Sequence, residues 1–99
     1  INAMVRTTSG TQAWRNGVAL GTAQQPGTAF NITLLNVGST ANSGYSNSIV
    51  YHNGVIAEVI IGRTALTQSD RQKIEGYLAH KWGLTASLPV DHPYKSVAP

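Results

Sequence analysis

The sequence predicts a mainly β protein, an antiparallel β-sandwich with one α-helix near its C-terminal end. Short strand-like runs separated by turn residues occupy residues 1–61. Two of these runs flank Asn16-Gly17, a strong hairpin signal because a type I′ turn needs positive φ at both central positions. One helical pattern follows at about residues 67–82. Hairpins at short spacing, followed by a single helix, are typical of a β-sandwich.

The strand assignments rest on β-branched and apolar runs bounded by turn residues. The run Val55–Ile61 is the most apolar of the chain and predicts a strand that is buried on both faces. A polar loop, Gly38–Ser48, separates it from the preceding strands. The expected strands are residues 4–8, 11–15, 18–22, 30–37, 49–51 and 55–61.

The helix has recognisable ends. Thr67 is suited to the N-cap, and Asp70 three residues later completes a short form of the capping box. Gly83 stands where a left-handed residue ends a helix, and an irregular tail of residues 84–99 follows. Four apolar side chains share one helical face, and we assign them to the core because so short a helix is marginal alone. They are Ile74, Tyr77, Leu78 and Trp82.

The composition excludes several classes of protein. Only 11% of the residues are charged, and the net charge is +3. Residues 1–49 contain Arg6 and Arg15 but no acid, and no basic run suggests a nucleic-acid partner. The absence of cysteine excludes thiolate metal sites, and no apolar run reaches the ~20 residues of a membrane span. This uncharged composition favours an extracellular location, at a cell surface or in a virion.

The C-terminal motifs carry a family resemblance. They are the apolar run after Gly54, Arg63 to Thr67, Asp70 to Leu84, Leu88-Pro89 and His92-Pro93-Tyr94. Over roughly residues 54–95 the chain resembles the C-terminus of a laminin-G-like, concanavalin A-like lectin or glucanase domain. Such domains occur in bacterial surface proteins and in phage structural proteins.

The resemblance implies a jelly-roll sandwich of which residues 1–99 are the C-terminal part, because the N-terminal strands of the family are missing. It implies a non-enzymatic module of a larger surface or virion protein, used for structural display and for adhesion by carbohydrate binding. The alternative is an accessory carbohydrate-binding domain of a carbohydrate-active enzyme. A half sandwich leaves a sheet edge and an apolar face open, so we expect the 99-residue chain alone not to be a monomer.

No catalytic or metal-binding constellation stands out. Glu58 lies within an apolar strand without the second carboxylate that a glycosidase pair requires, so we expect it to be a buried acceptor. Calcium prefers six to eight oxygen ligands, several of them carboxylates, and no acid precedes Glu58. We therefore predict no enzyme activity and no cofactor, calcium included. The histidines His52, His80 and His92 lack metal-ligand spacing.

Aromatic and amide side chains give the remaining hypothesis for a binding site. Sugars stack on aromatic faces and bond to amide groups, and Tyr45 in the polar loop has Asn42 and Asn47 near it in sequence. Trp14 is a further candidate, with a role in the core as the equal alternative. We predict a metal-free carbohydrate site at this loop. The partner would be a cell-surface glycan or a neighbouring structural subunit.

Overall fold

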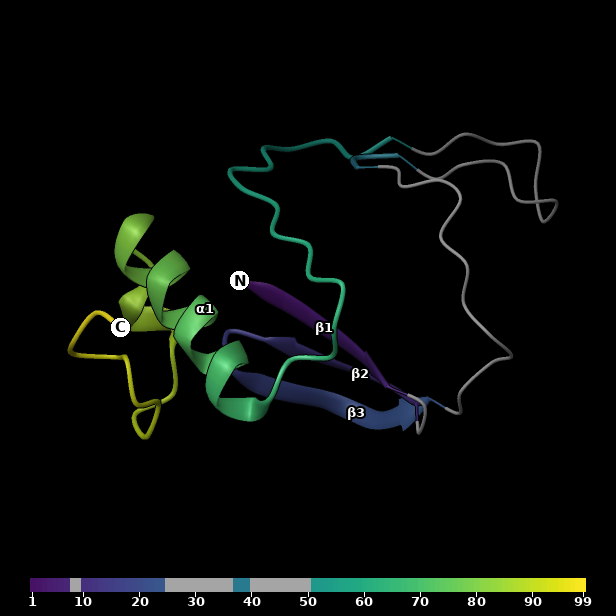
Figure 1. Cartoon of the computed structure of the whole chain (residues 1–99). Helices are drawn as coiled ribbons and strands as arrows, with labels where there is room; N and C mark the ends of the chain where they lie inside the picture. Colours follow the sequence, from purple (N-terminus) through teal and green to yellow (C-terminus); the bar gives the residue numbers. More distant parts are fainter. Residues whose placement is uncertain (8–9, 25–36, 40–50) are drawn as a thin grey trace, which may run out of the picture. The chain divides into compact units, whose positions relative to one another are not determined.

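In the residues that it describes, the computed structural model has one three-stranded sheet and one α-helix (Figure 1). The chain forms two compact units, residues 29–61 and, together, residues 1–28 and 62–99. We call the second of these the sheet–helix unit. The residues that the structure describes are 1–7, 10–24, 37–39 and 51–99.

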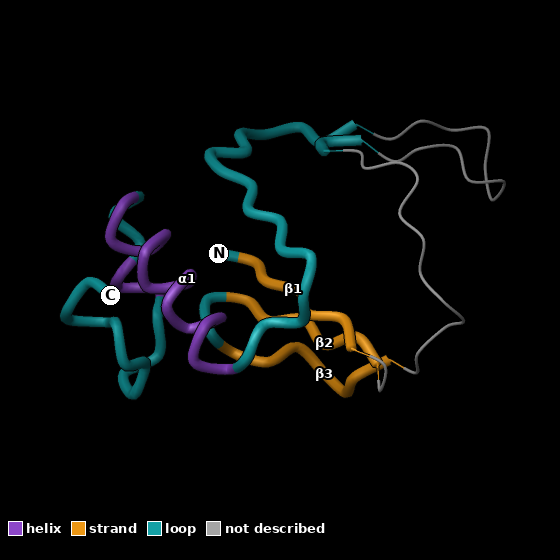
Figure 2. The backbone as a smooth tube through the Cα atoms, in the orientation of Figure 1, coloured by secondary structure: helices purple, strands orange, loops and turns teal. Residues whose placement is uncertain are grey.

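The sheet is a meander of β1 (Asn2–Thr7), β2 (Gly10–Arg15) and β3 (Val18–Gln24), antiparallel and in the order β1-β2-β3 (Figure 2). The three predicted strands and the hairpin turn are confirmed. Asn16 and Gly17 both have positive φ, 50° and 83°, as the type I′ turn requires.

The helix α1 (Gln68–Lys81) begins and ends at the predicted positions. Thr67 accepts a hydrogen bond from the backbone N–H of Asp70 at 3.1 Å, and its hydroxyl donates to the Asp70 carboxylate at 2.7 Å. Gly83 has a φ of +68°, and the N–H of Leu84 bonds to the carbonyl of Ala79, which closes the last turn. A short 3₁₀ helix, η1 (Thr85–Ser87), follows.

The prediction of the buried helix face is wrong. Tyr77 and Trp82 are 42% and 45% exposed, although the apolar pattern placed both in the core. The buried face of the helix lies on a different side of its axis from the predicted one. Small residues and an ion pair, rather than large apolar side chains, contact the tail and the sheet. The buried residues of α1 are Arg71, Glu75, Gly76 and Ala79.

The predicted jelly-roll β-sandwich is also wrong. One sheet of three strands and one helix make up the described part of the chain, which is too little sheet for a sandwich. Residues 55–61 form no strand, and the apolar ones are exposed rather than buried on both faces. Apolar and β-branched residues favour a strand only where a neighbouring strand pairs with them.

The loss of the jelly roll also removes two functional assignments. The assignments as a lectin and as a phage protein were implied by that fold, and the three-stranded sheet with one helix does not support them. The strand expected at residues 30–37 and most of the Gly38–Ser48 loop lie outside the described residues. Of the strand expected at 49–51, only Tyr51 is described, and it forms an isolated bridge with Ser39.

Candidate functional site

The most distinctive feature of the sheet–helix unit is a buried cluster of three ionisable side chains, Arg71, Glu75 and His92. Arg71 and Glu75 are four residues apart on α1 and therefore lie on the same face, one turn from each other. The Nη1 atom of Arg71 lies 2.6 Å from each carboxylate oxygen of Glu75. His92 comes from the tail, and its Nε2 atom lies 3.3 Å from Oε2 of Glu75.

The backbone near His92 indicates which ring nitrogen carries the proton. The N–H of Tyr94 donates to Nδ1 of His92 at 3.3 Å, so Nδ1 acts as an acceptor. A neutral imidazole then carries its proton on Nε2, which donates to Glu75. Glu75 is only 1% exposed, and both of its oxygens have partners. The carboxylate is thus compensated within the unit.

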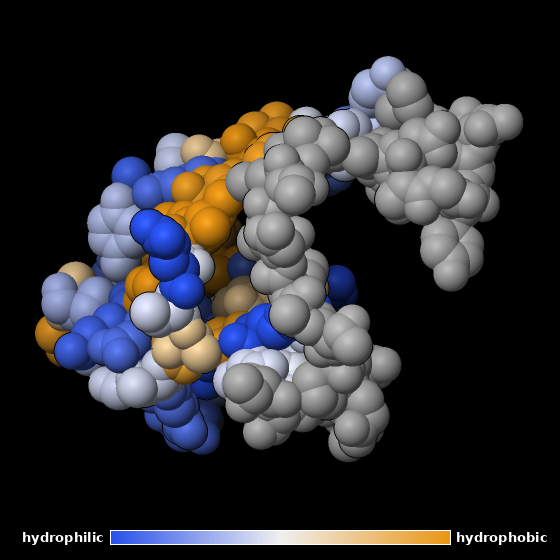
Figure 3. All heavy atoms as spheres, turned by 45° about the vertical axis from the view of Figure 1, so that its right-hand side comes forward, coloured by the Kyte–Doolittle hydropathy of each residue, from blue (hydrophilic) through white to orange (hydrophobic). Residues whose placement is uncertain are grey.

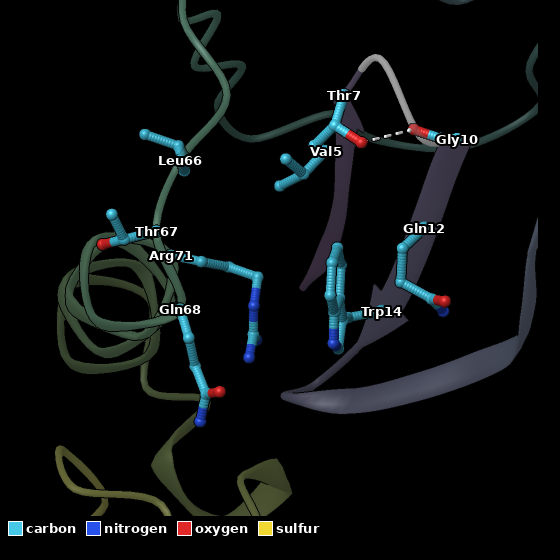
Figure 4. Close-up of a pocket in the computed structure, with 9 residues that line it drawn as sticks. All are labelled: Val5, Thr7, Gly10, Gln12, Trp14, Leu66, Thr67, Gln68 and Arg71. Atoms are coloured by element: carbon cyan, nitrogen blue, oxygen red, sulfur yellow. Dashed lines mark hydrogen bonds between the residues drawn. The ribbon is translucent and has the colours of Figure 1, made fainter. Parts of the chain in front are cut away.

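Trp14 of β2 covers the arginine from the side of the sheet. The guanidinium carbon of Arg71 lies 4.4 Å from the ring centroid, within the range of a cation–π contact. In Figure 4 the guanidinium and Gln12 lie on opposite sides of the indole. One ring face is therefore occupied by Arg71, which agrees better with the structural role considered for Trp14 than with a platform for sugar stacking.

The other residues predicted for carbohydrate binding cannot be placed beside Trp14. Tyr45, Asn42 and Asn47 lie outside the described residues. The metal-free sugar site at the polar loop remains a prediction.

A hollow of about 330 Å³ adjoins Trp14 and Arg71 (Figure 4). It lies between the sheet and the start of α1, and both apolar and polar side chains line it. They include Val5, Thr7, Gln12, Trp14, Leu66 and Gln68. A second hollow, of about 320 Å³, borders Arg71 and His92 from the direction of the tail.

The tail is held against α1 by specific contacts. Within the tail, Nζ of Lys95 donates to three backbone carbonyls, the shortest bond being 2.5 Å to Leu88, and so fixes the shape of the segment that meets α1. Nε2 of His80 lies 3.0 Å from the carbonyl oxygen of Tyr94. A Cβ atom at position 76 would overlap with Cβ of Tyr94, so only glycine permits this close approach. Leu88, 3% exposed, adds the apolar contact.

The tail also contacts the hairpin turn. A Cβ atom on Gly17 would lie 3.1 Å from the ring of His92 and 3.2 Å from Pro89. The cluster therefore joins three segments that are far apart in the sequence, namely the hairpin, the helix and the tail.

This arrangement is suited to holding structure together rather than to chemistry. Glu75 shares its oxygens with Arg71 and His92, and its burial leaves no open face toward a substrate. Among residues 1–7, 10–24, 37–39 and 51–99, no three His, Asp or Glu side chains gather in a way that could hold a metal ion.

Sequence reasoning missed this cluster as a unit. The helical face predicted to be buried did not include Arg71 or Glu75, although opposite charges four residues apart on a helix are a known pairing signal. His92 was noted for lacking metal spacing. A sequence pattern could not show that it folds back onto α1 from 17 residues away.

Within the described part of the chain, no helix has both the length and the hydrophobicity needed to cross a membrane.

A scan against protein-family models, a search of curated proteins and a search of solved structures found no match to this chain. The resemblance to laminin-G-like domains remains a prediction.

Proposed function

We propose that this chain is a non-enzymatic module of a larger extracellular or surface protein, with a role in structural display. The observation that supports it best is the state of Glu75, which is 1% exposed and bonded through both oxygens. Catalytic carboxylates face a cleft where a substrate can reach them. Glu75 instead faces Arg71 and His92 and so connects the helix to the tail. We call Glu75, Arg71, His92 and Trp14 together the clamp.

The clamp accounts for how a small unit stays folded. Ala79 and Leu88 are its only buried apolar side chains among the described residues, so the apolar core is small. Polar contacts take over part of the role of a larger apolar core. The Arg71–Glu75 ion pair and the contact of Trp14 with Arg71 connect the helix to the hairpin, and the contact of His92 with Glu75 connects the helix to the tail. Removing one partner of such a buried pair typically costs about 3–5 kcal/mol, because the other charge is left uncompensated.

The change Glu75→Gln separates a structural from a catalytic role without knowledge of any substrate. Residues at active sites are commonly poor for stability, so replacing them leaves the melting temperature unchanged or raises it. A clamp residue behaves in the opposite way. We therefore expect Glu75→Gln to lower the thermal midpoint of the chain strongly, measured by circular dichroism at 222 nm.

Asp91→Asn provides the matched control. Asp91 is an exposed acid next to His92, and its replacement should leave the midpoint nearly unchanged. An unchanged or raised midpoint for Glu75→Gln would contradict the structural role. In the larger protein, displayed on cells with an epitope beyond this module, Glu75→Gln should lower surface staining at 37 °C, while Asp91→Asn should not.

A further inference from the structure

The chain contains two Asn-Gly pairs, Asn16-Gly17 and Asn53-Gly54, and both are followed by valine. An asparagine before a glycine is open to one intramolecular reaction, because glycine has no Cβ atom to keep its backbone nitrogen away from the side-chain amide carbon. Attack of that nitrogen on the amide carbon closes a five-membered succinimide ring. The local structure decides how readily the two atoms meet.

The hairpin turn restrains the first pair. Asn16 and Gly17 have φ values of 50° and 83° in the turn between β2 and β3. Oδ1 of Asn16 accepts a hydrogen bond from the nitrogen of Ile1 at 2.6 Å, and the N–H of Asn16 donates to the Ile1 carbonyl at 2.7 Å. The contact of Gly17 with His92 and Pro89 adds to this restraint. Ring closure at Asn16 therefore requires its side chain to leave Ile1 and the turn to open.

The second pair lies in exposed chain. Asn53 and Gly54 are both exposed and belong to none of the helices and strands that the structure describes. Val55, the next residue, is 92% exposed and begins the apolar segment of residues 55–61. Figure 3 shows hydrophobic residues, in orange, at the surface of the molecule. Water therefore reaches the Asn53–Gly54 peptide bond, and water is the reactant that opens a succinimide.

An imidazole ring lies against the second pair. A Cβ atom on Gly54 would lie 2.8 Å from Nε2 of His52 and 3.3 Å from its Cε1. The ring is thus beside the residue whose N–H loses its proton when the succinimide forms. The backbone N–H of His52 donates to the carbonyl of Gly38 at 2.8 Å, which fixes the start of this segment. Because a neutral imidazole accepts protons effectively near pH 7, His52 is suited to take the Gly54 proton.

We propose that Asn53 is a modification site that reacts without an enzyme or a cofactor, with His52 as the proton acceptor. The Gly54 nitrogen forms a bond to the side-chain amide carbon of Asn53, and its proton passes to His52. The carbon–nitrogen bond of the side-chain amide then breaks, and the nitrogen leaves as ammonia with the proton that His52 returns. One water molecule opens the ring. Cleavage at the side-chain carbon leaves aspartate, and cleavage at the backbone carbon leaves isoaspartate.

Either product changes the chain at the point where the apolar segment begins. A carboxylate replaces a neutral amide, so the net charge of +3 falls by one. Isoaspartate also adds one methylene group to the main chain, which moves Gly54 away from His52. This inference is independent of the structural role proposed above.

The two Asn-Gly pairs are matched sites within one molecule, and their rates test the proposal. The 99-residue chain is incubated at pH 7.4 and 37 °C in water enriched in oxygen-18, and the peptides that contain each pair are followed by mass spectrometry. Asn53 should lose its amide and take up oxygen-18 at least about tenfold faster than Asn16, because the turn must open first. An enzyme that methylates L-isoaspartyl residues should label the Asn53 peptide. In concentrated urea the two rates should become similar.

Two variants examine the chemistry at Asn53. Gly54→Ala adds a Cβ atom beside His52 and should slow the reaction about tenfold. His52→Gln removes the proton acceptor and should slow it about threefold, and added imidazole should accelerate this variant proportionally more than the unchanged chain. Gly62→Ala, at an exposed glycine with room for a Cβ atom, is the control and should leave the rate unchanged. Far-ultraviolet circular dichroism of each variant should retain the helical signal of the unchanged chain.

Four results would overturn the proposal. Asn53 could keep its amide throughout the incubation, or Asn16 could react as fast as Asn53 in the folded chain. The product could be aspartate alone, which would mean that water attacks the side chain directly and no ring forms. His52→Gln could react at the rate of the unchanged chain, which would show that the imidazole does not accept the proton.

Discussion

At the scale of single residues, the buried charges determine how the sheet–helix unit holds together. A carboxylate that is 1% exposed is tolerated only because hydrogen bonds and an opposite charge replace the lost water. Arg71 is itself 6% exposed and relies on Glu75 and Trp14 in turn. Each charge of the pair is therefore costly without the other.

This dependence predicts strong coupling between Arg71 and Glu75. Arg71→Met leaves Glu75 buried without its cation and should cost about 3–5 kcal/mol of unfolding free energy. The double variant Arg71→Met with Glu75→Gln should cost clearly less than the sum of the single changes. Urea denaturation of all four proteins measures this, with Arg63→Met, at an exposed arginine, as the control. Additive costs would show that the two side chains act independently.

Gly76 gives a second prediction, in which the direction of the change in stability is informative. In an isolated helix Gly→Ala stabilises by about 1 kcal/mol. Here the added methyl group meets Tyr94, so Gly76→Ala should instead destabilise by roughly 1–3 kcal/mol. The comparison is a peptide of residues 66–84 against the full chain, each carrying Gly76→Ala. A stabilised full chain would mean that the tail is not held against α1.

At the scale of elements, local signals predicted the ends of the elements but not the faces they bury. The Asn16-Gly17 turn, the Thr67 cap and Gly83 each depend on the backbone of a few neighbouring residues, so the sequence reveals them directly. The buried face of α1 depends on what the tail brings to it, which is not local. Hydrophobicity then favoured Trp82, whose indole lies 5.6 Å from Nζ of Lys81 at the surface.

The assignment of Trp82 to the core is therefore wrong, because its side chain is 45% exposed. The cap offers the better test at this scale. Thr67→Ala removes the acceptor for the Asp70 N–H and should lower the stability of the chain by about 1 kcal/mol. Thr64→Ala, at an exposed position before the helix, should change it little. Equal effects of the two changes would show that the cap contributes nothing.

At the scale of the whole molecule, the sandwich prediction failed because the hydrophobicity of a segment does not specify which other segment pairs with it. Residues 55–61 have the composition of a central strand, yet they form none in this chain. The candidate site was missed for a related reason. Its members are Trp14, Arg71, Glu75 and His92, and only the fold brings such distant positions together.

The tail gives a prediction at this scale. A chain ending at Leu84 lacks His92 and Tyr94, and with them the hydrogen bonds of the tail to Glu75 and His80 on α1. Its helical circular dichroism should fall well below that of the full chain at 25 °C, because an undocked helix of 14 residues is marginal. A chain ending at Lys95 keeps those contacts and should retain the full signal. Equal signals from both would mean that α1 needs no tail.

The contact of the hairpin turn with His92 and Pro89 has a consequence for synthesis on the ribosome. The hairpin emerges before the tail that completes its environment, because it comes first in the sequence. Until His92 leaves the exit tunnel, Arg71 is the one partner of the cluster that Glu75 can bind, and the Gly17 turn lacks its contact with the tail. Long-range closure of this kind slows folding, because the intervening loop must be ordered first. The nascent chain therefore holds its sheet without these contacts until the tail emerges, and residues 55–61 leave the ribosome before His92 does.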